Sequence, residues 1–400
     1  MGASAVSSGS DSSAPAGTAP AGADVIDAGE IATETNEAIW DAAASGAEGV
    51  VVTAIDGDGH PEIHRIDADT PASTVADAQQ LEATISSGGG GVVAVEPDHA
   101  VRVSGTNDPG RSAQWALTQL DYEGLWPTND GTGVCVAVVD TGTQTTHPDL
   151  AGLVVGTADF TGEGPADGYG HGTHVAGIVG ATANNGVGVT GAAPGVDLLS
   201  VKVLASNGSG LSSWTADGII WAVDHGATVL NLSLGASCPP AQSTGCVSTA
   251  MQTAISYAQS NDVLVVAAAG NDGDPNGPSA GNWSWPAAYT WPIAVAATTS
   301  SSAHSGFSTS ASYVDVAAPG TSIYSTYLTS VNGGYAYMSG TSMATPYVTA
   351  LAALLRGAHP GETATQIKAR ITSTATDLGA PGPDPDFGWG LINPAAATAG

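Results

Sequence analysis

VCVAVVDTGTQTTHPDL, residues 134–150, begins with a continuous apolar run and turns polar at Asp140. A strand with one solvated face alternates apolar and polar residues, whereas a strand buried on both faces reads as an unbroken apolar run. We therefore expect a strand of a parallel sheet here, with Asp140 at its carboxyl end. Functional groups of such sheets gather at that edge.

The same pattern recurs four times downstream and alternates with helical segments. This alternation predicts an α/β fold for residues 114–400, with a doubly wound, mostly parallel sheet and helices on both faces. The predicted strands lie at residues 196–204, 227–234, 262–271 and 292–298, and the predicted helices at 173–183, 212–226, 247–260 and 340–355.

The residues before position 114 have a different composition. Residues 1–25 mix Ser, Ala, Gly and Pro in low-complexity order and cannot bury enough apolar area to fold, so we expect disorder. Residues 26–104 predict a small α+β domain, and the polar segment 105–113 links it to the rest. Within that domain the predicted helices lie at 31–44 and 73–87, and the predicted strands at 49–55, 61–68 and 91–103.

The charge balance excludes some partners. Seven Lys and Arg against 37 Asp and Glu give a net charge of −30, which argues against binding to nucleic acid or to an anionic membrane. No run of 18 apolar residues exists, so we expect no membrane-spanning helix. Residues 1–24 have neither a basic start nor an apolar stretch, so we expect no signal peptide in the sequence as it stands.

Three cysteines occur in two contexts. Cys238 and Cys246 bracket the short loop CPPAQSTGC, which we expect a disulfide to close in an oxidising compartment; two unpaired surface cysteines would give the same sequence. Cys135 lies in the apolar run GVCVAVV. We expect it to be a buried, inert free thiol.

Asp140, His171 and Ser342 each have an ordinary structural interpretation. They read as a turn residue, a packing or capping residue at the start of HGTHVAGIVG, and a helix cap in SGTSMATP. Taken together they have a chemical one, since a serine hydroxyl becomes a good nucleophile only with a base and an orienting carboxylate nearby. A doubly covered parallel sheet would bring all three to one edge.

His174 raises an alternative to the role of His171 beside a nucleophilic serine. It follows His171 by three residues, so the two imidazoles share one helical face and could bind zinc. The Glu that zinc hydrolases place between two such histidines is absent, and no third ligand stands nearby in a motif.

Asn271 closes the run VVAAAGN. Its side-chain amide could donate a hydrogen bond to the oxyanion that forms when Ser342 attacks a carbonyl. The Ser342 N–H, free at a helix start, would be the second donor. The small residues around Ser342 would let a substrate approach.

The segments DTGTQTTHPDL, GHGTHVAG, SLG, AAAGN and GTSMATP, in this order, resemble those of the subtilase family of serine endopeptidases. The resemblance covers about residues 114–394 and implies a subtilisin-like fold. It also implies hydrolysis of peptide bonds in proteins through an acyl-enzyme. In that reaction Asp140 orients, His171 is the general base and acid, Ser342 attacks, and Asn271 serves the oxyanion, in the chain order known for subtilisin.

The chain departs from the family pattern just after GTSMATP. The family usually continues with His and then Val-Ala-Gly, whereas Tyr347, Thr349 and Ala350 stand here. We expect altered helix packing rather than lost activity. A catalytically silent, peptide-binding relative would keep the groove and lose a triad member, and all three members are present.

The resemblance also implies how a substrate binds. In the family, two segments pair with the backbone of an extended peptide, and two triplets of this chain match them. A third triplet would line the pocket for the residue before the cut bond. These residues are Gly208, Ser209, Gly210, Ser233, Leu234 and Gly235 for the backbone, and Ala268, Ala269 and Gly270 for the pocket. Asp272 could attract a basic side chain or simply face solvent. Four tryptophans are candidates for subsites or for the core: Trp214, Trp283, Trp285 and Trp291.

Residues 26–104 resemble the family's propeptide, an intramolecular inhibitor removed by self-cleavage, with the cut expected between about Ser104 and Arg111. Such a precursor is secreted. The resemblance further implies a structural calcium ion and no organic cofactor. The implied ligands are Asp149, Asn185 and the carbonyls of Ala183, Val187 and Val189.

Overall fold

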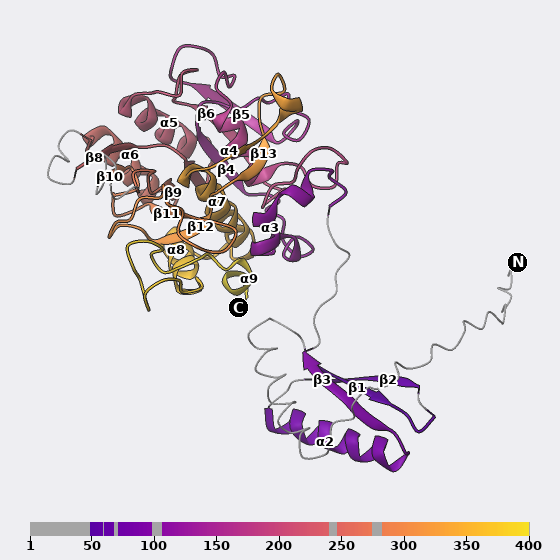
Figure 1. The fold of residues 1–400 in the computed structure, drawn as a ribbon. Helices are drawn as coiled ribbons and strands as arrows, with labels where there is room; N and C mark the ends of the chain where they lie inside the picture. The colour runs from indigo at the N-terminus through magenta and orange to yellow at the C-terminus, as the bar shows by residue number, and fades with distance from the viewer. Residues whose placement is uncertain are drawn as a thin grey trace, which may run out of the picture. The chain divides into compact units, whose positions relative to one another are not determined.

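The computed structural model describes residues 49–58, 60–67, 71–97, 106–239, 246–273 and 282–399 (Figure 1). The segment predicted to be disordered, residues 1–25, and the helix predicted at 31–44 lie outside these ranges. The chain divides into two compact units, Met1–Val103 and Ser104–Gly400.

The first unit is a three-stranded antiparallel sheet, in the order β2-β1-β3, that packs against one helix. Val52 and Ala54 of β1 are fully buried against Ala78 and Ile85 of α2. This is the predicted α+β arrangement. The elements are β1 (Gly49–Ile55), β2 (Pro61–Asp67), α2 (Pro71–Ser87) and β3 (Gly91–Pro97).

The second unit is built on a seven-stranded parallel sheet in the order β12-β11-β9-β7-β4-β6-β5. From β4 the chain goes to β5 at one edge and returns to β6, which lies between them; it then crosses to β7 and continues outward through β9, β11 and β12. The switch therefore falls beside β4, where open α/β sheets place their sites. The strands are β4 (Cys135–Asp140), β5 (Val154–Asp159), β6 (Asp197–Lys202), β7 (Val229–Leu232), β9 (Leu264–Ala268), β11 (Ile293–Thr298) and β12 (Val316–Pro319).

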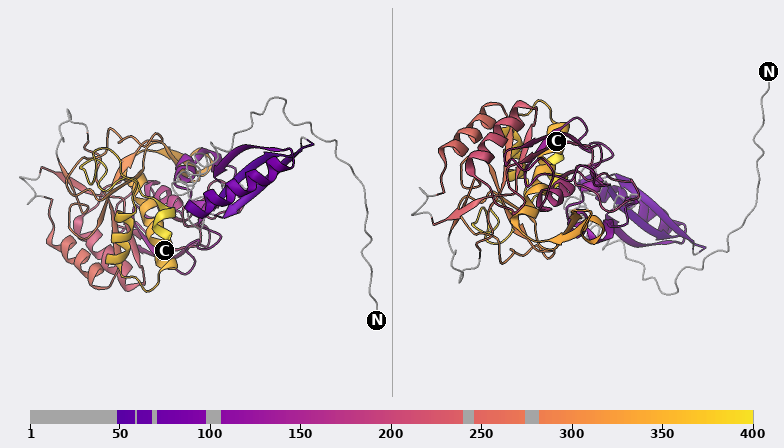
Figure 2. Two further views of the ribbon diagram at one scale, coloured as in Figure 1. Left: turned by 90° about the horizontal axis from the view of Figure 1, so that it is seen from below. Right: turned by 90° about the horizontal axis from the view of Figure 1, so that it is seen from above.

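Helices cover both faces of this sheet, as the unbroken apolar strands predict. Val136 and Val138 of β4 pack with α4 (His171–Gly180) and α7 (Thr341–Ala358). Ala137 and Val139 of the same strand pack on the other face with α5 (Ser212–Asp224) and α6 (Thr249–Ser260). Figure 2 shows the pink to salmon helices α5 and α6 apart from the orange to yellow helices that follow. Shorter helices are α3 (Trp115–Leu120), α8 (Ala364–Ser373) and α9 (Pro394–Thr398).

α7 is largely buried, and its Tyr347 is one of the positions at which the chain departs from the family pattern. Tyr347 is 1% exposed and packs near Tyr122, whose hydroxyl donates to the Tyr347 carbonyl (2.5 Å). How this packing differs from that of other family members stays a prediction. Among the described residues, no helix is both long and apolar enough to cross a membrane.

Several strands escaped sequence prediction. β5 alternates between partly buried and exposed residues and contains Gly156, so it lacks the unbroken apolar run. Two short antiparallel pairs lie outside the main sheet. They are β8 (Ala236–Cys238) with β10 (Trp283–Trp285), and β13 (Ile323–Thr326) with β14 (Tyr335–Met338).

Candidate active site

Asp140 and His171 form a hydrogen-bonded pair. Asp140 ends β4 and is fully buried, and His171 is the first residue of α4. The imidazole Nδ1 lies 2.8 Å from Asp140 Oδ1 and 3.0 Å from Oδ2. The Thr141 N–H also donates to Oδ1 (2.7 Å). The carboxylate therefore fixes the ring through Nδ1 and leaves Nε2 for another group.

The surroundings raise the pKa of His171 above its ordinary value. Burial of the ring acts in the opposite direction, because it disfavours the charged form. The charge of Asp140, its hydrogen bond and the charge of Asp167 outweigh that burial. The site thus stabilises the imidazolium that a general base becomes after it accepts a proton.

Ser342 is the second residue of α7 and lies against Ser233. Its hydroxyl donates to the Ser233 carbonyl (3.1 Å), and the Ser233 hydroxyl donates to the Ser342 carbonyl (2.8 Å). Ser233 and His171 line one cavity of about 480 Å³. The hydroxyl is therefore held next to the imidazole's cavity without bonding to the ring.

A buried polar network supports Ser233 from behind. The Thr349 hydroxyl donates to Asn231 Oδ1 (2.9 Å), and Asn231 Nδ2 donates to the Ser233 hydroxyl (2.9 Å). Thr349 is one of the positions at which the chain departs from the family pattern. Its hydroxyl has found a partner rather than being left unsatisfied, which a buried polar group requires.

The Asn271 side chain is hydrogen-bonded at the start of α7. Its Oδ1 accepts from the Thr341 N–H (2.9 Å) and hydroxyl (3.1 Å), so the amide Nδ2 remains available as a donor. A Cβ on Gly340 would lie 3.5 Å from that Nδ2 and 3.6 Å from the Ser342 nitrogen. The missing side chain of Gly340 thus opens a space that faces both donors.

The two triplets predicted to bind the substrate backbone come together, since all six residues line the cavity that also contains His171. The predicted pocket residues Ala268, Ala269 and Gly270 lie outside this lining. Ala269 is fully buried, and the Gly270 N–H donates to the Thr341 hydroxyl (3.2 Å). They adjoin the helix start, and their role at the pocket stays a prediction.

Of the tryptophans named from the sequence, Trp285 lines the cavity, whereas Trp214 and Trp291 pack against the core. Other residues of the cavity were not singled out from the sequence. Trp285 is followed along the chain by Tyr289, whose ring lies against it. The residues missed are mostly apolar, and they lack a local signal because core residues look the same in sequence: Leu204, Leu211, Met251 and Tyr289.

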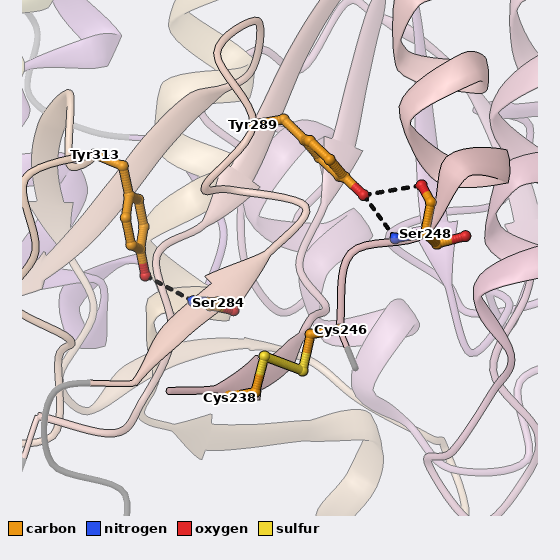
Figure 3. Close-up of a disulfide and its surroundings, with 6 residues drawn as sticks. All are labelled: Cys238, Cys246, Ser248, Ser284, Tyr289 and Tyr313. Carbon is orange, nitrogen blue, oxygen red and sulfur yellow. Dashed lines mark hydrogen bonds between the residues drawn. A yellow bond between two sulfur atoms is a disulfide. The ribbon is translucent and has the colours of Figure 1, made fainter. Parts of the chain in front are cut away.

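The structure pairs Cys238 with Cys246, and Cys246 lies in the wall of the cavity (Figure 3). The segment that follows Cys246 is also fixed at Ser248, since the Tyr289 hydroxyl accepts from the Ser248 N–H (3.1 Å) and donates to the Ser248 carbonyl (3.0 Å). Cys135 is free, as predicted, but it is only partly buried. Burial still raises the pKa of its thiol to about 11, which keeps it protonated and inert.

The zinc alternative does not fit the geometry. His174 is fully buried, and its Nε2 lies 3.1 Å from the carbonyl oxygens of both Ile323 and Ala336. Burial lowers the pKa of His174 to about 3, so the ring is neutral and acts as a packed hydrogen-bond donor. Nε2 thus faces backbone carbonyls rather than a metal site shared with His171.

The predicted calcium loop holds two buried carboxylates. Asp149 accepts from Asn185 Nδ2 and from the Val189 N–H (both 2.9 Å). Asp108, which the sequence analysis missed, accepts from three N–H groups of the same loop, including that of Asn185 (3.1 Å). Within the described ranges, no Lys or Arg side chain pairs with either carboxylate. Two buried carboxyl groups without a Lys or Arg partner fit a divalent ion that prefers oxygen ligands.

In the described part of the chain, no three His, Cys, Asp or Glu side chains gather closely enough to hold a metal ion. A calcium ion in this loop would therefore need backbone carbonyl and amide oxygens beside the carboxylates. The carbonyls of Ala183, Val187 and Val189 remain predicted ligands.

An Asp–His pair beside a serine at a helix start, on the carboxyl edge of a parallel sheet, is the layout of a serine hydrolase. The comparisons with known proteins specify it further. The sequence profile of the Subtilase family matches residues 131–390. Thermitase of Thermoactinomyces vulgaris is 45% identical over 281 residues, covering 69% of this chain and 93% of thermitase. Subtilisin E of Bacillus subtilis (strain 168) is 42% identical over 309 residues, covering 76% of this chain and 75% of subtilisin E.

Solved structures agree. A protease of Pseudoalteromonas arctica PAMC 21717 superposes with a TM-score of 0.64 at 33% identity, covering 74% of this chain and 99% of that protease. MycP1 with its N-terminal propeptide removed has a TM-score of 0.62 at 32% identity, covering 72% of this chain and 96% of that one. The chain belongs to the subtilase family, and it is a subtilisin-like serine endopeptidase.

Proposed function

We propose that Asp140, His171 and Ser342 are the catalytic triad of this endopeptidase. The hydrogen bond from His171 Nδ1 to the buried Asp140 carboxylate carries the proposal, because it leaves Nε2 to take the Ser342 proton. The serine hydroxyl has only to turn away from the Ser233 carbonyl. Catalytic hydrogen bonds of this kind often tighten only when substrate binds.

The reaction would run through an acyl-enzyme. Ser342 Oγ attacks the peptide carbonyl as His171 accepts its proton, and the imidazolium then protonates the leaving amine. Asn271 Nδ2 and the Ser342 N–H donate to the oxyanion in the space beside Gly340. Water repeats the sequence on the acyl-enzyme and releases the second product.

The substrate would bind as an added strand. Residues 208–210 and 233–235 line the cavity, and three of these positions are glycine, which allows close approach of another backbone. Proteins and peptides in extended form are therefore the proposed substrates.

The proposed form at synthesis is an inactive precursor. The division between Val103 and Ser104 separates a small α+β unit from the catalytic unit, and a relative's structure is described with its N-terminal propeptide removed. Self-cleavage between about Ser104 and Arg111 would detach the first unit, which until then inhibits the enzyme. The disulfide between Cys238 and Cys246 supports secretion into an oxidising compartment.

The loop around Asp149 is the proposed calcium site, with Asp108 added to the residues predicted from the sequence. Bound there, calcium would neutralise the two carboxylates and fix the loop that follows α4. It would contribute stability and take no part in the chemistry.

Incubation with a mixed peptide library, followed by mass spectrometry, tests the proposal. The full chain should cut itself and the peptides, while Ser342→Ala should remain whole and leave the library intact. Hydrolysis by Ser342→Ala at the wild-type rate would refute the assignment of the nucleophile. Inhibition of the wild type by removing zinc alone would favour the metal hydrolase instead.

A further inference from the structure

The helix that begins with His171 has no cap of its own. Its N-cap residue is Gly170, which has φ = 102° and no side chain to accept a hydrogen bond. A larger residue is excluded because a Cβ there would collide with the ring of Tyr327. The first N–H groups of a helix are free and need partners, so α4 must obtain them from elsewhere.

Asp167 supplies those partners from outside the helix. Its side chain is 8% exposed. Oδ1 accepts from the N–H groups of Tyr169 (2.9 Å) and Gly170 (2.8 Å). Oδ2 accepts from the Thr173 N–H (2.9 Å) and hydroxyl (2.7 Å). One carboxylate thus fixes the turn on both sides of His171.

The same carboxylate is tied to the strand that carries Asp140. The Thr141 hydroxyl donates to Asp167 Oδ1 (2.9 Å) and accepts from the Gly172 N–H (2.9 Å). The Thr141 N–H in turn donates to Asp140 Oδ1, the oxygen that also faces His171 Nδ1. The end of β4 and the start of α4 are therefore joined twice, once through the catalytic pair and once through Thr141 and Asp167.

We propose that Asp167, acting through the Thr141 hydroxyl, is a positioning residue that fixes the Asp140 carboxylate and the His171 ring relative to one another. Asp167 neither touches the substrate nor exchanges a proton. It holds two elements that the chain brings together only at this edge. Thr141 is the link, because its hydroxyl contacts both Asp167 and the helix. This inference rests on the proposed triad.

The pH dependence of kcat/KM should reflect the pKa of His171, which depends on the charged and titratable groups around its ring. Asp140 lies at the end of β4 and Asp167 in the loop before α4, and both raise the pKa of His171. His174, one turn further along α4, stays neutral. Lys202 at the end of β6 donates to the Thr141 carbonyl (2.9 Å), and the Tyr327 hydroxyl donates to the Tyr169 carbonyl (2.9 Å).

The test uses the processed wild-type enzyme and four variants. Asp167→Asn removes the charge and one acceptor, and Asp224→Asn removes a charge from an exposed position on α5 as a matched control. Thr141→Val removes the linking hydroxyl, and Thr141→Ser retains it. For each, kcat, KM and the pH dependence of kcat/KM are measured on a peptide substrate. The values are divided by the fraction of enzyme that a fluorophosphonate labels, so that folding losses do not count as catalytic ones.

Asp167→Asn should lower kcat about 10-fold or more while KM stays within about twofold, since the substrate contacts are intact. The acidic limb of its kcat/KM profile should move to lower pH, because a nearby negative charge that raises the pKa of His171 is gone. Thr141→Val should lower kcat in the same way without that shift. Thr141→Ser and Asp224→Asn should behave like the wild type.

Wild-type kcat and an unmoved acidic limb in Asp167→Asn, with only a lower melting temperature, would reduce Asp167 to a helix cap and overturn the inference. Wild-type kcat in Thr141→Val would overturn the inference as well. If Asp167→Asn does not fold, the comparison of Thr141→Val with Thr141→Ser decides whether the inference holds. If the wild-type enzyme hydrolyses no peptide, or if Ser342→Ala hydrolyses peptides as fast as the wild type, the proposed function itself is refuted.

Discussion

The two sides of the candidate active site differ in how complete they are. On the side of β4 and α4, the Asp140 carboxylate and the His171 ring are already bonded, at 2.8 Å and 3.0 Å. On the side of α7, the Ser342 hydroxyl is bonded to the Ser233 carbonyl, 3.1 Å away. The fold thus already orients the His171 ring, whereas the Ser342 hydroxyl must first break its hydrogen bond to the Ser233 carbonyl.

This difference follows from what each group must do. An imidazole held by a buried carboxylate keeps one tautomer, which is useful at every stage of the reaction. A hydroxyl that turns between two acceptors stays hydrogen-bonded before a substrate arrives and can still reach the base afterwards. Changes on the first side should therefore affect orientation, and changes on the second should affect transition-state binding.

The largest effect on kcat should come from disrupting the hydrogen bond between Asp140 and His171. Asp140→Asn preserves the shape but favours the wrong imidazole tautomer, so kcat should fall by about 10⁴-fold, the magnitude known for serine proteases. Steady-state kinetics on a peptide substrate measure it. A loss below about tenfold would mean that Asp140 does not orient His171.

A smaller effect should come from the donor beside Ser342. Asn271→Ala removes the Nδ2 donor and should lower kcat by about 10²- to 10³-fold with little change in KM, the magnitude known for subtilisin. Asp272→Ala is the control, because it changes the neighbouring residue without altering that donor. Equal losses in both variants would point to a disturbed loop rather than to oxyanion binding.

Calcium removal should affect stability and leave the triad intact. At about a 100-fold excess over Kd, a bound ion adds about 2.7 kcal/mol to the free energy of unfolding, which corresponds to several degrees in melting temperature. A chelator should lower the melting temperature of the wild type, and added calcium should restore it. Asp149→Asn should respond less to either treatment. An equal response in the variant would place the ion elsewhere.

The last expected effect is the pH dependence of stability, to which His171 and His174 contribute with opposite sign. The pKa of His171 is raised by folding, so its contribution is present at low pH and is lost as pH rises through that pKa. The pKa of His174 is lowered to about 3, so its contribution is present above about pH 6.5 and is lost as pH falls.

Melting curves between pH 7 and pH 4, recorded on the Ser342→Ala chain to prevent self-digestion, separate the two. His174→Gln should flatten the loss of stability on acidification, whereas His225→Gln, at an exposed position, should leave it unchanged. An unaltered slope in His174→Gln would contradict the burial of a neutral ring.

Sequence alone predicted the central sheet because its strands have a local signal. β9 is an unbroken apolar run, β4 and β11 are apolar up to their last residue, and β7 is apolar apart from Asn231; only a doubly covered sheet can bury such strands. β5 lies at the sheet's edge, and its alternating exposure resembles that of many loops. The residues at the carboxyl ends could be proposed as a site because parallel strands share that edge.

The supporting residues could not be predicted, because their roles depend on contacts across the fold. Asp167 and Thr141 are 26 residues apart and meet only through a side-chain hydrogen bond. Asp108 reaches the loop at Asn185 across 77 residues, although it looks like part of a polar linker. A hydrogen bond between distant polar residues leaves no periodic pattern in the sequence.

Covalent labelling with a fluorophosphonate, followed by identification of the labelled peptide, tests the central claim most directly. The account predicts a single label on Ser342, at a rate that falls as His171 becomes protonated and that collapses in His171→Ala. Labelling of a different serine, or labelling of Ser342 at an unchanged rate in His171→Ala, would contradict it.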